Sequence, residues 1–240
     1  MLLLSPDFFA GLKAPVDFYI LRHGQSEGNA SKILQGRGEF SLSEEGRLQA
    51  AARGRALKAV LADKSRALFF SSPQGRAKET ALIIAEEAGL GEPVFIDELL
   101  EMSLGIWTGK AWEDVKNDAL WNDFQARSWD AIPGAESSAD LYDRALRTWA
   151  ALRDRVTESG HVEKVIAVTH GGLIQWLIKS TLQNRSWFPL FPISNCGQFR
   201  LSAKPHPSGK SASLYWEEIN SPIPADKFPE KPLEPRGFPS

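Results

Sequence analysis

The 240-residue sequence has a single cysteine, Cys196, and no apolar run long enough to cross a membrane. One cysteine excludes an intramolecular disulfide and a four-cysteine zinc site, which suits a reducing compartment. A membrane span takes about 18 or more apolar residues in a row. The apolar start at 1–4 has no basic flank, and Pro6 and Asp7 interrupt it, so no signal peptide is expected. We therefore expect a cytoplasmic protein without a membrane partner.

The sequence also lacks an excess of charge of either sign. Its 28 basic and 30 acidic residues give a formal net charge of -2 at pH 7. Because nucleic-acid-binding proteins usually need a clearly basic face, we expect no nucleic-acid partner. Basic side chains such as Arg53, Arg55 and Lys58 are interpreted as a solvated helix face. Hydrophobic residues make up 42% of the chain, which is enough for a full core without disulfides or structural metals.

Proline is concentrated at the end of the chain, where 221–240 holds six of the 15 prolines. Because proline cannot continue a central strand or helix, this tail is expected to be an extended arm or a disordered end. Residues 1–220 are expected to form a single domain with a lid segment at about 102–136. We expect this domain to be a monomer or a homodimer.

Short apolar runs alternate along the chain with helical patterns. Continuously apolar runs, typical of strands buried on both faces, lie at 17–21, 67–70, 93–96 and 164–168. Apolar residues three or four positions apart predict four helices: Leu48, Ala52, Ala56 and Val60 after Ser43; Ala77, Ala81, Ile84 and Ala88 before Gly89; Leu141, Ala145, Trp149, Leu152 and Val156 after Ser137 or Ser138; and Leu173, Trp176 and Leu177.

Two later alternating runs, 197–203 and 214–219, predict edge strands. Together with the earlier runs, they predict an α/β fold. We expect a three-layer sandwich, with a mostly parallel central sheet of about six strands and helices on both faces.

Chemically useful side chains follow each of the four predicted parallel strands. Arg22 and His23 follow the first strand, Arg76 the second, Glu101 the third and His170 the fourth. Ligands of open parallel sheets lie beyond the carboxyl ends of the strands, so these side chains should lie close together. Taken singly, each has an ordinary structural explanation. Their occurrence at successive strand ends favours a functional site.

This set of residue types points to a phosphoryl group. A phosphate monoester carries a charge of about -1.5 to -2 and three acceptor oxygens. Arginine matches those oxygens with a planar fork and stays charged. Histidine is often unprotonated near neutral pH, so it can attack phosphorus. Two histidines without clustered aspartates offer too few hard ligands for a two-metal site, so no metal is expected.

The order and spacing of these residues resemble the histidine phosphatase superfamily, which has the phosphoglycerate-mutase-like fold. The resemblance covers roughly residues 17–220. Seven blocks occur in register, and their members are Arg22-His23-Gly24 with Ser26 and Asn29; Leu34-Gln35-Gly36-Arg37; Leu42-Ser43-Glu44-Glu45-Gly46; Ser71-Ser72-Pro73 with Arg76 and Thr80-Ala81; Glu101 with Gly105, Trp107 and Gly109; Pro133-Gly134 with Glu136-Ser137; and Val168-Thr169-His170-Gly171-Gly172.

The resemblance implies a role for each matching residue. His23 would be the nucleophile that becomes phosphohistidine, and Glu101 would protonate the leaving oxygen and later activate water. The phosphoryl oxygens would be held by Arg22, Arg76 and His170. Further substrate contacts are expected from Asn29, Ser26, Gly171 and Arg37. No cofactor is expected. Gln25 and Gly28 depart from the residues that many members carry there, glutamate and tryptophan, which affects specificity.

Three functions fit this resemblance. The first is a metal-independent phosphomonoesterase acting on a small phosphorylated metabolite. The second is a 2,3-bisphosphoglycerate-dependent phosphoglycerate mutase. The resemblance implies that mutases of the family carry a longer basic insertion after the general acid. Here 102–132 holds only Lys110, Lys116 and Arg127 as bases, beside four tryptophans, and this favours the phosphatase. The third, a non-catalytic domain that binds phosphorylated ligands, is disfavoured because His23 and Glu101 are both present.

Overall fold

A single six-stranded sheet forms the centre of the computed structural model, which describes residues 5, 7–61 and 63–228. Its strands are β1 (Val16–Arg22), β2 (Ala67–Ser71), β3 (Val94–Phe95), β4 (Lys164–Thr169), β5 (Gln198–Pro205) and β6 (Ala212–Ser221). They lie in the order β3-β2-β4-β1-β5-β6. The first four are parallel, and β5 and β6 continue the sheet in antiparallel pairing.

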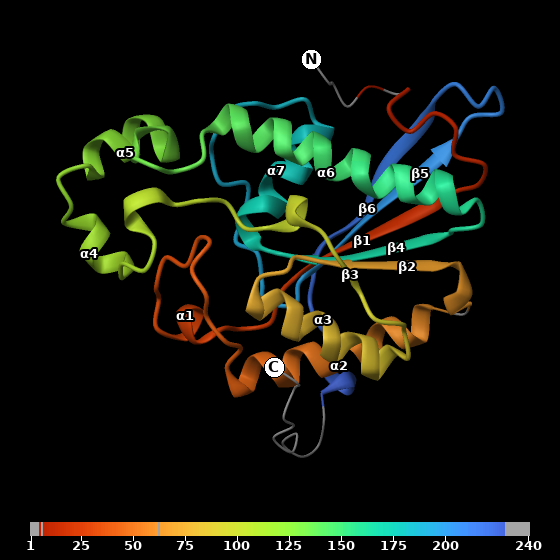
Figure 1. The fold of residues 1–240 in the computed structure, drawn as a ribbon, viewed down its shortest axis with the longest axis horizontal. Helices are drawn as coiled ribbons and strands as arrows, with labels where there is room; N and C mark the ends of the chain where they lie inside the picture. Colours follow the sequence, from red (N-terminus) through yellow and green to blue (C-terminus); the bar gives the residue numbers. More distant parts are fainter. Residues whose placement is uncertain (1–4, 6, 62, 229–240) are drawn as a thin grey trace.

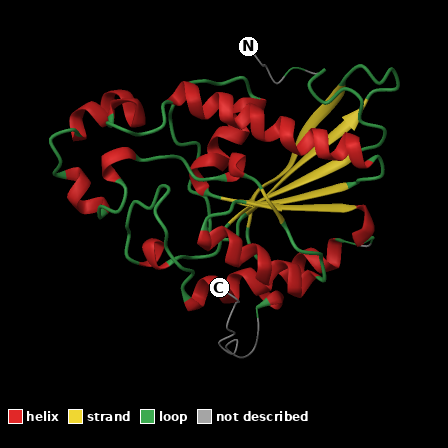
Figure 2. Ribbon diagram, viewed as in Figure 1, coloured by secondary structure: helices red, strands yellow, loops and turns green. Residues whose placement is uncertain are grey.

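Helices cover both faces of the sheet (Figures 1 and 2). One face carries α2 (Glu44–Val60) and α3 (Gly75–Ala88), and the other carries α6 (Ser138–Ser159) and α7 (Gly171–Thr181). Side chains of β1 alternate between two hydrophobic clusters: Phe18 and Ile20 pack with α6 and α7, whereas Tyr19 and Leu21 pack with α2 and α3. The predicted α/β fold with three layers and a mostly parallel sheet is confirmed.

Three of the four predicted helices bury the expected residues. In α6 the whole stripe from Leu141 to Val156 is buried, and Ser137 caps the helix by accepting from the backbone N–H of Asp140. In α3 the four predicted positions are fully buried. That helix ends at Gly89, whose φ of 67° allows the left-handed C-cap.

The buried face of α2 differs from the prediction. Its core face consists of small residues around Ala50, Ala51 and Gly54, whereas Val60 is 48% exposed. A Cβ atom at Gly54 would meet the Cα atom of Ile84 at 3.2 Å, so the missing side chain allows α2 and α3 to pack closely. Of the four predicted positions, Ala52 is fully buried and Val60 is exposed, so the apolar period located the helix but only part of its buried face.

The interpretation of Arg53 as a solvated residue of α2 is wrong. Its side chain is buried, and its guanidinium group donates to the carbonyl oxygens of Cys196 and Ser221 and to the side chain of Gln198. Arg53 thereby connects α2 to β5 and β6.

Two strand predictions also need correction. The third run forms only the two-residue β3 at one edge of the sheet, where Val94 is 50% exposed instead of buried on both faces. The run at 197–203 is not an edge strand, because β5 lies between β1 and β6. Only β6 forms the second edge.

The remaining helices lie mostly beyond the carboxyl ends of the parallel strands, where Figure 1 shows α1, α4 and α5. They are α1 (Glu27–Ala30), α4 (Trp112–Lys116) and α5 (Trp121–Arg127), with the 3-10 turns Lys64–Arg66, Asp97–Leu99, Gly105–Trp107, Ser128–Ala131 and Ala225–Lys227. In the described part of the chain, no helix combines the length and apolar character of a membrane span.

The predicted tail at 221–240 is described only as far as Phe228. Ser221 ends β6, and the turn at Ala225–Lys227 lies against α2, where Arg55 Nε donates to the Lys227 carbonyl oxygen across 2.7 Å. The part of this prediction that concerns 229–240 lies outside the described residues.

Candidate active site

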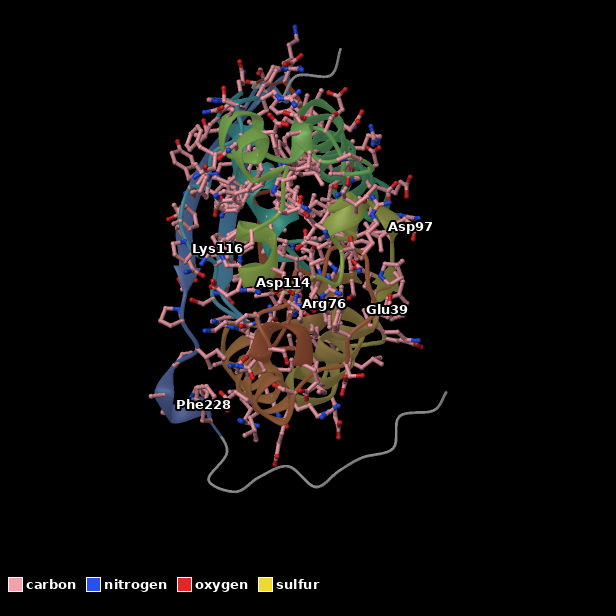
Figure 3. The ribbon with its side chains drawn as sticks, turned by 90° about the vertical axis from the view of Figure 1, so that its left-hand side faces the viewer. Glu39, Arg76, Asp97, Asp114, Lys116 and Phe228 are labelled. Carbon is pink, nitrogen blue, oxygen red and sulfur yellow. The ribbon has the colours of Figure 1, made fainter. Side chains whose placement is uncertain are left out.

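A cavity of about 340 Å³ lies at the carboxyl ends of β1 and β4. Its polar end is formed by residues that follow strands, because each parallel strand delivers its next residue to the same edge of the sheet. Six of the nine predicted site residues line it: Arg22, His23, Asn29, Arg76, Glu101 and Gly171. Figure 3 looks onto this end of the molecule and labels Arg76 together with two residues of α4.

The hydrogen bonds of His23 define its tautomer. Nδ1 lies 2.6 Å from the carbonyl oxygen of Gly24, which can only accept, so Nδ1 carries the proton. Nε2 lies 3.2 Å from Nε of Arg76, which can only donate, so Nε2 presents its lone pair. Burial, with the charges of Arg22 and Arg76 beside it, lowers the pKa of His23 well below its ordinary value. The ring is therefore neutral and presents an Nε2 lone pair at the cavity.

Arg76 is fixed by backbone carbonyl groups. Its side chain is 1% exposed, and Nη1 and Nη2 donate to the carbonyl oxygens of Gly38 at 2.9 Å and Gly36 at 2.8 Å. Gly36 has a φ of 48°, a left-handed conformation that glycine adopts without strain. Arg22 donates through Nη1 to the carbonyl oxygen of Ile193, and its Nε is buried without a partner in the described structure. Both arginines can turn unused N–H groups towards an anion in the cavity.

His170 lies behind the cavity instead of lining it. Its ring packs edge-on against His23, with the centroids 5.1 Å apart, and it is fully buried. Nε2 is 2.9 Å from Oγ of Ser72, whereas Nδ1 is buried with no partner among the described residues. Burial and the nearby charge of Arg76 lower the pKa of His170 well below its ordinary value. Nδ1 is thus the ring nitrogen of His170 that no described group engages.

Glu101 is held at the N-terminus of α7. Its Oε1 accepts from the backbone N–H groups of Met102 at 2.8 Å and Leu173 at 3.1 Å. Its Oε2 accepts from Gly172 at 3.1 Å, which leaves this oxygen capacity for a further partner. Gln74 accepts from the Glu101 backbone N–H across 2.8 Å and so positions the residue from the start of α3. The carboxylate can therefore exchange a proton with a ligand through Oε2.

Among the predicted substrate-binding residues, Asn29 and Gly171 line the cavity, whereas Ser26 and Arg37 do not. Asn29 uses Oδ1 to accept from Ser26, and its Nδ2 group has no partner in the described structure. Ser26 caps α1 and is fully buried. Arg37 lies at the surface and pairs with Glu136 at 3.3 Å.

Sequence reasoning missed several residues at the cavity. Gln35 lines it and accepts from Ser26 Oγ at 2.7 Å. A Cβ atom at Gly28 would meet the Gln35 side chain at 2.6 Å, so the unusual glycine noted above makes room for this glutamine. Trp187 and Phe191 also line the cavity, from a loop without regular structure. The Gly28 departure was a usable signal for Gln35, but the loop offered none.

Comparison with known proteins places this geometry in context. The model of the Histidine phosphatase superfamily (branch 1) matches residues 18–208. Glucosyl-3-phosphoglycerate phosphatase of Mycolicibacterium vanbaalenii is 34% identical over 219 residues, covering 82% of this chain and 90% of that protein.

Solved structures give the same result. A mycobacterial glucosyl-3-phosphoglycerate phosphatase superposes with a TM-score of 0.72 at 28% identity, over 86% of this chain and 99% of the other. A phosphoglycerate mutase from Bacillus anthracis superposes with a TM-score of 0.68 at 22% identity, over 86% and 94% of the two chains. This last similarity shows the phosphoglycerate-mutase-like fold.

Proposed function

The chain belongs to branch 1 of the histidine phosphatase superfamily and is a phosphatase of that superfamily, and we propose that it hydrolyses a small phosphate monoester through a phosphohistidine at His23. One observation carries this proposal. The neutral His23 ring directs its Nε2 lone pair at the guanidinium group of Arg76, at the polar end of the cavity. The proposed nucleophile, His23, and a cation that can bind the phosphoryl oxygens, Arg76, are thus adjacent before substrate binds.

In the first step, Nε2 of His23 attacks phosphorus and forms an N–P bond while the P–O ester bond breaks. The departing alkoxide takes a proton from the carboxyl group of Glu101 and leaves as an alcohol. Arg22 and Arg76 neutralise the negative charge on the phosphoryl oxygens throughout. The free Nδ2 of Asn29, the backbone N–H of Gly171 and Nδ1 of His170 supply further donors.

In the second step, water attacks the phosphohistidine. Glu101, now a carboxylate, accepts a proton from the water as the O–P bond forms and the N–P bond breaks. Inorganic phosphate leaves, His23 regains its neutral ring and Glu101 regains its proton. The same carboxyl group therefore serves as acid and then as base, and every charge on phosphorus is met by arginine, so the scheme requires no metal ion.

The test is to trap the intermediate. Brief incubation with labelled 4-nitrophenyl phosphate in the presence of EDTA, followed by an alkaline quench, should leave acid-labile label on His23. His23→Ala should lose label and turnover by several orders of magnitude, as for other covalent nucleophiles. A variant with a tenth of wild-type turnover would refute the assignment. Interconversion of 2- and 3-phosphoglycerate, stimulated by 2,3-bisphosphoglycerate and faster than hydrolysis, would favour the mutase instead.

A further inference from the structure

Charged groups and a larger number of apolar side chains line the cavity. Beside His23, the two arginines, Glu101 and the amides of Asn29, Gln35 and Gln175, its walls contain mainly apolar side chains. Six of them are Leu34, Leu104, Trp129, Trp187, Phe191 and Ile193. Whatever is attached to the bound phosphoryl group therefore extends along an apolar surface.

This apolar wall is already assembled. Phe191 stacks on Phe199, with ring centroids 6.1 Å apart and an interplanar angle of 17°. Gln175 holds the loop that carries Phe191, since its Nε2 donates to the Phe191 carbonyl oxygen at 2.8 Å and its Oε1 accepts from Leu190 N–H at 3.1 Å. Although Gln175 lines the cavity, both its amide nitrogen and its amide oxygen are therefore hydrogen-bonded to this loop. A preformed apolar wall binds an apolar group at little ordering cost.

The same region offers no counter-charge for a second anion. Among the described residues, the cationic side chains that line the cavity are Arg22 and Arg76, which the proposed mechanism uses for the phosphoryl group, and Glu101 cannot supply a positive charge. Two arginines outside this lining are engaged elsewhere, since Arg37 and Arg144 both pair with Glu136, at 3.3 and 2.7 Å. A carboxylate or second phosphate on the substrate would lose its hydration without gaining a cationic partner.

We propose that the substrate is a phosphate monoester with an apolar, ring-sized body that carries no second anionic group. This inference rests on the function proposed above and names its substrate class. It separates this chain from the relatives named for a phosphoglycerate, because glycerate carries a carboxylate. It also disfavours bisphosphorylated ligands for the same electrostatic reason.

A matched pair of substrates tests the proposal. 2-Phenylethyl phosphate and its analogue with a carboxylate on the para position release primary alcohols of similar leaving ability, so their rates differ mainly through binding of the body. We expect kcat/KM for the uncharged ester to be about tenfold or more above that of the carboxylated analogue, and also above that of glycerol 3-phosphate. Equal values, or a preference for either of the other two, would overturn the proposal.

Variants connect the preference to the cavity wall. Leu34→Arg places a cation in the wall and should raise kcat/KM for the carboxylated analogue, relative to the uncharged ester, by about tenfold. Trp187→Ala should lower the ratio of 2-phenylethyl phosphate to glycerol 3-phosphate. Tyr215→Ala, an aromatic truncation at a 49% exposed position of β6, is the matched control and should leave the ratio unchanged. The proposal would be contradicted if neither the Leu34→Arg nor the Trp187→Ala variant changed its ratio of kcat/KM values from that of wild type.

Failure of this inference is distinguishable from failure of the proposed function. A protein that traps phosphohistidine but prefers charged bodies refutes only the substrate class. A protein that hydrolyses none of these esters, nor 4-nitrophenyl phosphate, refutes both.

Discussion

Nε of Arg76 donates to Nε2 of His23 across 3.2 Å, so the guanidinium group occupies the lone pair that would attack phosphorus. This bond must break when a phosphoryl group enters between the two side chains. Arg76 does not move far to do so, because Gly36 and Gly38 hold its other two nitrogens. The pair therefore keeps His23 neutral and oriented, and in the proposed mechanism the same guanidinium group then contacts the phosphoryl group.

Replacing Arg76 tests whether its geometry matters beyond its charge. Arg76→Ala should lower kcat by about 10²- to 10³-fold, comparable to removal of an oxyanion donor. Arg76→Lys keeps a cation but cannot donate to Gly36, Gly38 and a phosphoryl oxygen together, so we expect it to recover little of this loss. Single-turnover phosphorylation measures the effect, and thermal melting checks that the variants fold. A lysine variant as active as wild type would contradict the expectation.

Glu101→Gln should affect substrates according to their leaving groups. An alkoxide needs a proton when it departs, whereas nitrophenolate does not, so the variant should slow phosphorylation by 2-phenylethyl phosphate far more than by 4-nitrophenyl phosphate. Glutamine keeps the size of the side chain at the N-terminus of α7 but can accept through only one of its two terminal atoms, so thermal melting checks that the variant folds. Rapid-quench measurement of both half-reactions gives the comparison. Equal losses on the two esters would assign Glu101 a structural role.

The two buried histidines should make stability fall in acid. His23 and His170 have folded-state pKa values well below the ordinary 6.5, so the unfolded chain binds more protons below that pH. The free energy of unfolding should therefore decrease as pH falls below 6.5, by up to about 1.4 kcal/mol per pH unit for each histidine. Urea unfolding from pH 7 to 5 should show a smaller slope for His170→Asn than for wild type. His161→Asn, at an exposed position, should retain the wild-type slope, and equal slopes for all three proteins would contradict this explanation.

Lys179 should make the stability of the protein depend on pH in the alkaline range. Its buried ammonium donates to the carbonyl oxygens of Ser186 and Phe188 and faces the Trp187 ring at 4.9 Å, while desolvation lowers its pKa to about 8. The unfolded chain thus holds this proton more tightly than the folded protein. Wild-type stability should rise relative to Lys179→Met as pH increases from 8 to 10, as measured by urea unfolding. A constant difference between the two proteins would refute the lowered pKa.

The parts that sequence reasoning located well are those fixed by local rules. The stripe of α6 was predictable because large apolar residues recur with the helical period, and His23 because it directly follows a buried strand. The face of α2 was not, because alanine and glycine fit both the core and the surface. The burial of Arg53 depends on carbonyl groups of β5 and β6, far along the chain. The position of the Phe191 loop depends on Gln175, a contact that no periodicity encodes.

The central position of β1 determines when the site can form. β1 pairs with β4 on one side and β5 on the other, so the strand that delivers His23 has no neighbour in the sheet until residues 164–169 are present. During synthesis from the N-terminus, the nucleophile therefore emerges long before the strand that aligns it. Arg76 and Glu101 are also made in this interval. The proposed site consequently cannot be complete before β4 is made, and a chain that stops before β4 lacks the sheet contact that orders His23.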